Sequence, residues 1–302
     1  MPPEPPPSSR FVRRSAIARD VRRIGVREGA MLLVHASMRS LGWVVGGSET
    51  VVDALLDAVG PTGTVAAVAS WSDIPLRMDE WSAERRRAYL GEMPGFDPDH
   101  SEANPLYGRI PERLRSWPGS RKSAHPDQRV IAVGADAAWL TRPHPLDDSF
   151  GPGTPFARLV EADGQVLMLG APLRSLTLLH HAEALVDVPG KRRRIYALPF
   201  RGPGGREWRT LTDIDVEYGP FPYADVVPGG SDPLEGIAAI AEAALEAGIG
   251  TSGRIACAGG HLFPAAPLVR FAERWLTERF SAPDERDPEH PGRREAEAQR
   301  RE

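Results

Sequence analysis

Short apolar runs alternate with amphipathic segments along most of this chain, and this alternation constrains the fold more than any other feature. In SAIARDVRRIGV, the residues Ile17, Val21 and Ile24 recur at the spacing of one helix face. The next apolar run, MLLVHASM, predicts a buried strand over residues 31–35. A second helix is expected in SETVVDALLDAVG, with Ser48 as its N-cap. Strands and helices that take turns in this way predict an α/β fold, with a central, mainly parallel or mixed sheet flanked by helices.

The same alternation continues without a linker or an internal repeat, so we expect a single domain over residues 11–280. The further strands are expected in GTVAAVAS, VIAVG and QVLMLG, and the further helices in IPERLRSWPG, GTPFARLVEADG, GIAAIAEAALEAG and PAAPLVRFAERWLTERF. Residues 1–10 are rich in proline and residues 281–302 are charged, which predicts two disordered tails. The stretch 71–118 has little periodicity, and an irregular segment of this length is usually functional.

The composition argues against several classes of protein. A formal net charge of −4 argues against nucleic acid as the main partner, and no apolar run approaches the roughly 20 residues that span a bilayer. The N-terminus lacks the apolar core of a secretory signal, so we expect a cytoplasmic protein. Cys257 is the only cysteine, which excludes an internal disulfide, and in RIACAGG we expect it to be a small buried side chain. The sequence leaves open whether the protein is a monomer or a homodimer.

The segment LTLLHHAEAL places titratable groups inside an apolar run. If a helix begins near Ser175, then Thr177, His180 and Glu183 lie on one face at i, i+3 spacing. A neutral imidazole next to a carboxylate is suited to act as a general base. His181 points about 100° away round the helix, so a zinc site is not expected. From spacing alone, a pair of surface or internally satisfied histidines without a catalytic role remains the favoured interpretation.

A polar, glycine-rich loop follows the strand that ends at His35. In VHASMRSLGWVVGG it carries Ser37, Arg39, Ser40 and Gly42 before the next helix. A strand, such a loop and a helix N-terminus together present N–H and hydroxyl groups to phosphates. The segment contains neither GxGxxG nor a P-loop, and an ordinary strand–helix turn explains it equally well.

Two further segments bear on anion binding. SRKSAHP places Arg121 and Lys122 beside Ser123, which predicts either an anion clamp or a solvated charged loop. In FGPGTP, Thr154 is the expected N-cap of a helix that begins at Pro155.

Acidic residues occur near aromatic ones at two places. Asp73 lies beside Trp71 in SWSDIP, and Asp213, Asp215 and Glu217 alternate in TDIDVEYG. In an extended segment those three side chains would face one way. Such clusters form either solvated faces or sites for polycations, and spacing does not distinguish the two.

Taken in order, VHASMRSLG, SAHP and GPGTPFARLVEADGQVLMLGAPLRSLTLLHHAEA resemble the aminoglycoside 3-N-acetyltransferase family over about residues 12–280. The resemblance implies an α/β fold unrelated to that of the common acetyltransferase superfamily. It implies direct transfer of acetyl from acetyl-coenzyme A (acetyl-CoA) to an aminoglycoside amine in a ternary complex, usually at N3 of 2-deoxystreptamine, with antibiotic resistance as the effect. No metal is implied.

The same resemblance implies roles for individual residues. His180 matches the general base, and Glu183 matches the carboxylate that orients it. On the cofactor side it places Ser37, Arg39, Ser40, Gly42, Lys122, Ser123 and Thr154, and on the antibiotic side Trp71, Asp73, Asp213 and Asp215.

One position departs from the family pattern. The glutamate that similar members carry in the alanine-rich helix falls on Ala238, and Glu235, one turn earlier, is the expected substitute on the substrate side. The departure keeps two alternatives open: an acetyltransferase of the same fold that acts on another amine, and a coenzyme A-binding protein without catalysis. A metallohydrolase is a third, weaker alternative.

Overall fold

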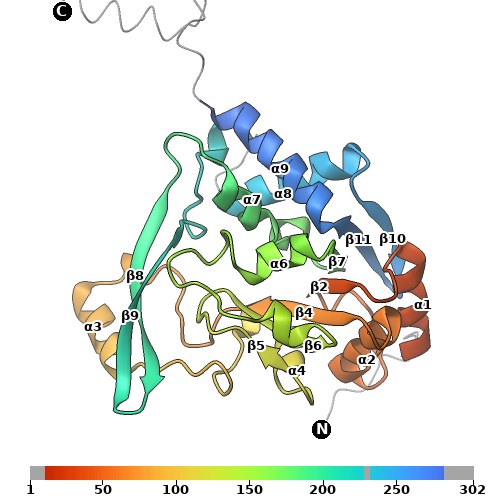
Figure 1. Ribbon diagram of the computed structural model, residues 1–302, viewed down its shortest axis with the longest axis horizontal. Coiled ribbons are helices and arrows are strands. Elements are labelled where there is room, and N and C mark those ends of the chain that lie inside the picture. The colour runs from red at the N-terminus through yellow and green to blue at the C-terminus, as the bar shows by residue number, and fades with distance from the viewer. Residues whose placement is uncertain (1–10, 228–231, 282–302) are drawn as a thin grey trace, which may run out of the picture.

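The computed structural model describes residues 11–227 and 232–281. Both expected tails, apart from Ser281, lie outside these residues. A seven-stranded mixed sheet is the centre of the described fold (Figure 1). Its order is β10 (Thr251–Ile255), β11 (Ala258–Pro264), β7 (Gln165–Leu169), β2 (Met31–Ala36), β4 (Thr64–Ala69), β6 (Arg129–Gly134) and β5 (Arg121–Lys122). The strands β7, β2 and β4 are parallel and their other neighbours antiparallel.

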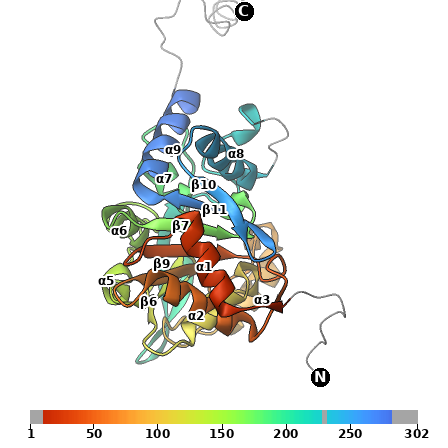
Figure 2. The ribbon, with the colours of Figure 1, turned by 90° about the vertical axis from the view of Figure 1, so that its right-hand side faces the viewer.

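Helices cover both faces of the sheet, so the domain has three layers (Figure 2). Successive strand residues point to opposite faces, and Leu32 and Leu33 accordingly belong to different core clusters. One face carries α1 (Arg14–Ile24), α2 (Gly47–Val59) and α4 (Arg109–Arg115). The other carries α5 (Ala137–Leu140), α6 (Pro155–Glu161), α7 (Leu179–Leu185), α8 (Pro233–Glu246) and α9 (Ala265–Phe280).

A long antiparallel hairpin stands beside this sandwich (Figure 1). It consists of β8 (Arg193–Gly202) and β9 (Gly205–Ile214), and a third apolar cluster, which includes Trp71, Phe96 and Phe200, anchors it. Arg206 of the hairpin donates to the carbonyl of Gly91 at 2.7 Å, which joins it to α3 (Ala83–Glu92). The short strands β1 (Phe11–Val12) and β3 (Trp43–Val44) pair in parallel. Four 3₁₀ turns are η1 (Met78–Glu80), η2 (Pro105–Tyr107), η3 (Leu173–Ser175) and η4 (Tyr223–Asp225).

The predicted α/β class, with a mixed sheet flanked by helices, is confirmed. Three local expectations are wrong. The N-cap of α2 is Gly46 with φ 81°, two residues before Ser48 and without a side-chain cap. The segment 71–118 contains α3, α4 and two 3₁₀ turns, so it is less irregular than expected. Cys257 is exposed, because it lies in the two-residue turn between β10 and β11.

Candidate active site

The carboxyl ends of β2, β4 and β7 meet at one edge of the sheet, because these strands are adjacent and parallel. This edge is where α/β sheets usually bind ligands. The chain leaving β2 stays close to β7, since the N–H of Ser37 donates to the carbonyl of Leu169 at 3.0 Å. The chain leaving β4 continues to Trp71, whose N–H donates to the carbonyl of Pro126 at 2.7 Å.

His180 and Glu183 form a close pair on helix α7. His180 Nδ1 lies 2.5 Å from Glu183 Oε2, as the i, i+3 spacing predicts. The Glu183 side chain is fully buried, whereas 12% of the His180 side chain is exposed. The helix begins at Leu179, after the separate turn η3, so the expected start near Ser175 is wrong. This geometry gives His180 a fixed carboxylate behind Nδ1, and no hydrogen bond from Nε2 is found within residues 11–227 and 232–281, so this atom is available to a ligand there.

Aromatic and titratable side chains from other elements surround this pair. The Tyr223 hydroxyl donates to the second oxygen of Glu183, and the Phe150 ring lies 5.1 Å from the His180 ring. His181 turns away and bonds the Phe150 carbonyl through Nδ1. His35 ends strand β2, and its Nε2 is enclosed without a hydrogen-bond partner in the described residues. Burial, with the nearby His180, lowers the pKa of His35 to about 4, so its ring is neutral at physiological pH.

The loop after β2 carries four of the predicted cofactor residues. Ser37 is half-buried, while Arg39, Ser40 and Gly42 are exposed. Ser40 Oγ lies 3.0 Å from Ser37 Oγ and 3.2 Å from the carbonyl of Gly170, so the loop is attached to the end of β7. Gly42 has φ 85°, and a Cβ there would approach Cys257 Sγ to 2.9 Å. The loop therefore has a defined shape and offers an exposed guanidinium and two hydroxyl groups.

The other predicted cofactor residues are less accessible. Lys122 is largely buried, with Nζ 3.6 Å from Asp99 Oδ1. Ser123 is fully buried, where its hydroxyl lies 3.0 Å from His144 Nδ1 and accepts from the N–H of Val130. Thr154 is also fully buried and caps α6 as predicted, accepting from the N–H of Ala157.

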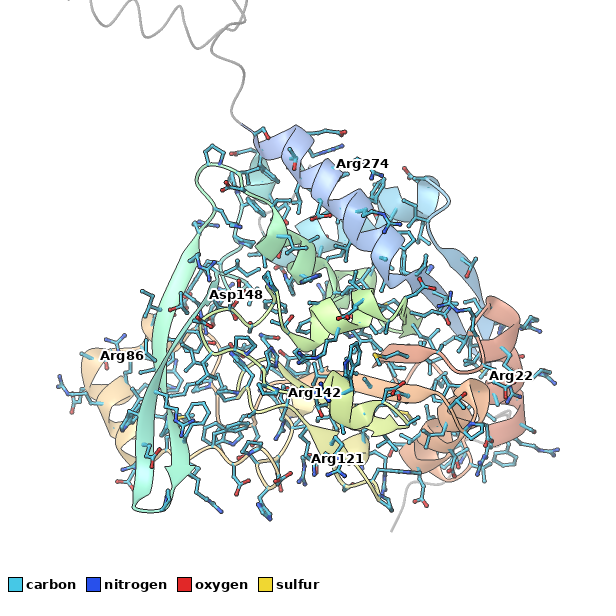
Figure 3. The ribbon with its side chains drawn as sticks, in the orientation of Figure 1. Arg22, Arg86, Arg121, Arg142, Asp148 and Arg274 are labelled. Carbon is cyan, nitrogen blue, oxygen red and sulfur yellow. The ribbon has the colours of Figure 1, made fainter. Side chains whose placement is uncertain are left out.

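Asp213 belongs to a buried polar chain rather than to an open surface. Ser149 donates to Asp213 Oδ2, and the carbonyl of Ser149 lies 2.7 Å from His144 Nε2, which connects Asp213 to Ser123. Figure 3 labels Asp148, the residue before Ser149 in the segment between α5 and α6. Burial, together with the nearby Asp127, raises the pKa of Asp213 to about 7.

The expectation that Asp213, Asp215 and Glu217 share one extended face is wrong. Strand β9 ends at Ile214, and Asp215 then accepts from the N–H of Tyr218 in a turn. Glu217 pairs instead with Arg194 of the hairpin.

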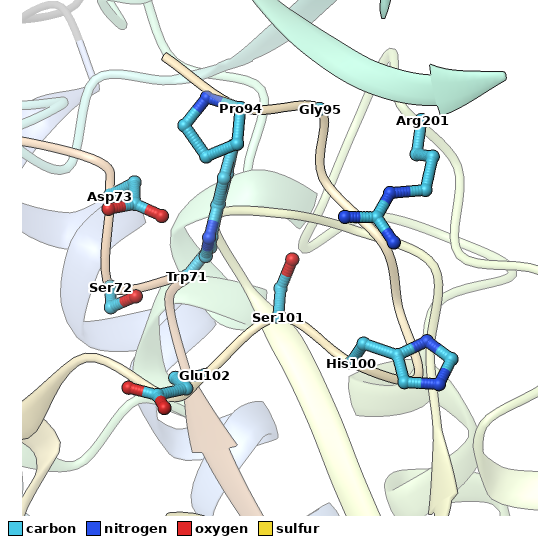
Figure 4. A pocket seen from close by; sticks show the side chains of 9 residues that line it. All are labelled: Trp71, Ser72, Asp73, Pro94, Gly95, His100, Ser101, Glu102 and Arg201. Carbon is cyan, nitrogen blue, oxygen red and sulfur yellow. The ribbon is translucent and has the colours of Figure 1, made fainter. Parts of the chain in front are cut away.

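A cavity of about 280 Å³ lies beside the end of β4. Figure 4 shows the carboxylates of Asp73 and Glu102 on one side of it, and the side chains of Arg201 and His100 on the other. Its full lining is Trp71, Ser72, Asp73, Pro94, Gly95, His100, Ser101, Glu102 and Arg201. Both of these side chains contact Asp97, at 3.4 Å from Arg201 and 2.9 Å from His100. Within the described residues, Asp73 and Glu102 form no ion pair, so their charges are available to a cationic ligand.

Helix α8 is the alanine-rich helix in which Glu235 was the expected substitute for a family glutamate. Glu235 lies in its first turn and is half-buried, as is Ala238. The carboxylate that contacts His180 comes from α7 instead, through Glu183.

Sequence reasoning did not assign His35, Glu102, Phe150 or Tyr223 to the site. Only His35 carried a usable signal, as a polar residue at the end of an apolar strand. Glu102, Phe150 and Tyr223 lie in segments without a period, so nothing in the sequence relates them to α7 or β4. Across the described ranges, no three His, Cys, Asp or Glu side chains are grouped to hold a metal, and none of the helices has the length and apolarity needed to cross a bilayer.

A histidine with a buried carboxylate behind it suits the removal of a proton from an amine. A family model described as aminoglycoside 3-N-acetyltransferase matches residues 33–277. The chain is 47% identical to aminoglycoside N(3)-acetyltransferase VIII of Streptomyces fradiae, covering 89% of this chain and 93% of that protein. It is 44% identical to aminoglycoside N(3)-acetyltransferase IX of Micromonospora chalcea, covering 88% and 93%. The chain belongs to the aminoglycoside 3-N-acetyltransferase family and is an acyltransferase.

Solved structures agree with this assignment. Aminoglycoside acetyltransferase AAC(3)-Xa superposes with a TM-score of 0.84 at 45% identity, covering 90% of this chain and 94% of that one. AAC-IIIb in a binary complex with CoASH gives 0.81 at 39% identity, covering 91% and 100%. Sisomicin-bound AAC-VIa gives 0.81 at 37% identity, covering 90% and 100%. The predicted family and its α/β fold are therefore confirmed.

Proposed function

We propose that the protein acetylates an amine of aminoglycoside antibiotics, N3 of the 2-deoxystreptamine ring, with acetyl-CoA as donor and His180 as general base. The observation that carries this proposal is the His180–Glu183 pair, whose buried carboxylate fixes Nδ1. Resistance to the antibiotic is the expected effect. The proposal includes a cytoplasmic location, in keeping with a single cysteine that forms no internal disulfide.

The base is needed because aminoglycoside amines are mostly protonated near neutral pH, and an ammonium group is not a nucleophile. Acetyl-CoA would supply the acetyl group as a thioester. The neutral amine would attack the thioester carbonyl directly within a ternary complex, the C–S bond would break and coenzyme A would leave as the thiol, so that no acyl-enzyme is required. His180 takes the proton of the attacking amine on Nε2, since Nδ1 faces Glu183. Glu183 holds the ring orientation and stabilises the imidazolium that forms. N–H groups of the loop after β2 are the proposed donors to the thioester oxygen.

The acetyl donor is proposed to bind at the loop that follows β2. Ser37, Arg39, Ser40 and Gly42 offer hydroxyl, guanidinium and N–H donors there, which fit phosphate and pantetheine groups. Lys122 adds a cation that Asp99 holds in place. Ser123 and Thr154 are proposed to act indirectly, since both are buried and their hydroxyls bond within the protein. A related structure that contains CoASH supports this use of the fold.

The antibiotic is proposed to bind in the acidic cavity. Trp71 lies in its wall, and Asp73 and Glu102 supply negative charge for a polycation. Asp213, Asp215 and Glu235 are proposed to contribute from the same side, with Asp213 acting through the buried network. A related structure described as sisomicin-bound supports an aminoglycoside as substrate.

Thiol release from acetyl-CoA tests the proposal. We expect release with gentamicin, kanamycin, neomycin and apramycin, and none with an aminoglycoside that lacks the 3-amine. His180→Ala should lower turnover by about 10²–10⁴-fold with little change in coenzyme A binding. His261→Ala is the control, because it changes a histidine on β11 whose Nδ1 lies 2.8 Å from Ser252 Oγ and which has no hydrogen bond to His180 or Glu183 within the described residues. Near-normal turnover in His180→Ala would exclude the proposed mechanism. If wild type released no thiol with any of the antibiotics, the proposed substrate class would be excluded.

A further inference from the structure

Glu183 uses both carboxylate oxygens in specific contacts. Oε2 lies 2.5 Å from His180 Nδ1, and Oε1 accepts from the hydroxyl of Tyr223. The Glu183 side chain has no exposed surface, so bulk water does not compete for either oxygen. Three side chains from two elements distant in sequence, α7 and η4, thus form one continuous hydrogen-bonded row that ends at the proposed base.

The Tyr223 ring is held from several sides. A Cβ at Gly236 of α8 would lie 2.3–2.5 Å from three ring carbons of Tyr223. The ring therefore fits at this place only because residue 236 has no side chain. Phe280 of α9 packs edge-to-face on it at 5.6 Å, and Phe221 does so at 6.0 Å. Tyr223 is 2% exposed. Its hydroxyl therefore cannot leave Glu183 without a shift of α8 or α9.

Tyr223 stays a donor over the working pH range. Burial, and then the Glu183 carboxylate, raise the pKa of Tyr223 far above its ordinary value. A phenol in this state donates one hydrogen bond and does not itself remove protons near neutral pH. The Tyr223 hydroxyl bonds Glu183. Any effect of Tyr223 on the reaction therefore acts through the Glu183 carboxylate.

We propose that Tyr223 is a positioning residue for the reaction: it fixes the Glu183 carboxylate and takes up part of its charge, and so sets the orientation and proton affinity of His180. This inference rests on the proposed function, in which His180 is the base. It also gives helix α8 a role at the site, because α8 contributes Gly236, which leaves room for the tyrosine ring.

The sign of the expected pH effect follows from the charges. Loss of the Tyr223 hydroxyl concentrates negative charge on Glu183, and the His180–Glu183 pair then holds its proton more tightly and releases it at higher pH. Among the described residues, His35 on β2, which is neutral, interacts with His180, and Lys191 interacts with Glu183 while its Nζ donates to the carbonyl of Ala184 at 2.9 Å. Neither is altered in Tyr223→Phe.

The experiment compares wild type, Tyr223→Phe and Tyr218→Phe. Tyr218→Phe is the matched control, since it removes a phenol that also donates to carboxylates, Asp79 and Glu80, but at the surface. We expect Tyr223→Phe to lower kcat about tenfold, to change both KM values less than about twofold, and to move the acid limb of kcat/KM up by about half a pH unit or more. The acid limb of Tyr218→Phe should coincide with that of wild type.

A second variant and a second readout keep the test decisive. Gly236→Ala should displace the ring and move the acid limb in the same direction. The His180 ring signal, assigned by its loss in His180→Ala, is titrated by NMR without any substrate, and its midpoint should rise in Tyr223→Phe and not in Tyr218→Phe. An unchanged midpoint and acid limb in Tyr223→Phe overturn the inference, while an inactive His180→Ala would still support the proposed function. If wild type acetylates no aminoglycoside, the proposed function fails and the NMR titration alone decides the role of Tyr223.

Discussion

At the scale of single residues, Asp213 shows how far burial changes a carboxyl group. It is 2% exposed, and its neighbours Ser149, Ile214 and Asp127 offer two hydrogen bonds but also a second negative charge. Burial is the largest cause of its pKa of about 7, which is well above the ordinary 3.8. In the folded protein Asp213 is therefore mostly neutral in mildly acidic solution. Its proposed contribution to the binding of a cationic substrate should therefore depend on pH.

This shift predicts a pH-dependent gain in stability for Asp213→Asn. Between about pH 4 and pH 7 the folded state binds the Asp213 proton more tightly than the unfolded state, so wild-type stability falls as pH rises through this window. The effect is at most about 4 kcal/mol. The amide keeps an acceptor for Ile214 and cannot ionise. The melting temperature of the variant minus that of wild type should be higher at about pH 8 than at about pH 5. An equal difference at both pH values would contradict this account.

Residues also show where sequence reasoning about the site stops. The His180–Glu183 contact was predictable, because both residues lie on one helix and their spacing sets their distance. The Tyr223 contact was not, since 40 residues separate it from Glu183 and only the packing of α8 and α9 brings the ring there. Asp213 and Asp215 were expected on one face, but the strand ends between them.

At the scale of elements, Thr154 connects the start of helix α6 to the turn before it. Its hydroxyl donates to the carbonyl of Gly151 at 2.7 Å and accepts from the N–H of Ala157 at 3.3 Å. Thr154→Ala leaves the N–H of Ala157 and the buried carbonyl without these partners, and should lower the free energy of unfolding by about 1–2 kcal/mol. Thr154→Ser keeps the hydroxyl and should lose much less.

Denaturant unfolding measures both Thr154 variants, and calorimetric titration measures their affinity for coenzyme A. Because the hydroxyl is fully buried and both of its bonds are internal, coenzyme A should bind Thr154→Ser as it binds wild type. A large loss of coenzyme A affinity in Thr154→Ser would mean that the methyl group of Thr154 contacts the cofactor, or that a loop which contacts it has shifted. Direct contact would contradict the proposed indirect role of Thr154.

Elements were predictable where one face is buried. Helices α1 and α2 place Ile17, Val21, Val51 and Leu55 in the core, and their apolar period is visible in the sequence. Helix α3 has no buried residue and so has no period to detect. The hairpin β8–β9 is buried at residues 198–200 and again at Leu211, Asp213 and Ile214. Its other residues are exposed or half-buried, so the apolar alternation expected of strands is missing over most of its length.

At the scale of the whole molecule, the charges suit two substrates of opposite sign. The formal net charge is −4, yet the loop after β2 presents Arg39, with Lys122 as a second cation on the proposed cofactor side. The cavity beside β4 presents Asp73 and Glu102 without ion-pair partners in the described part of the chain. Under the proposed function, an anionic cofactor and a cationic antibiotic would each be attracted to a different one of these two parts.

If the cavity carboxylates attract the antibiotic, then salt should weaken antibiotic binding by screening that attraction. Raising salt from about 0.05 M to about 0.5 M shortens the screening length several-fold, and the aminoglycoside KM of wild type should rise roughly three- to tenfold. Asp73→Asn with Glu102→Gln should raise KM at low salt more than it lowers kcat, and should flatten the salt dependence. Glu242→Gln, on the exposed face of α8, removes one equal charge away from the cavity and is the control. If the double variant follows the same salt curve as wild type, the antibiotic is held by other groups, because screening acts only on charges that contribute to its binding.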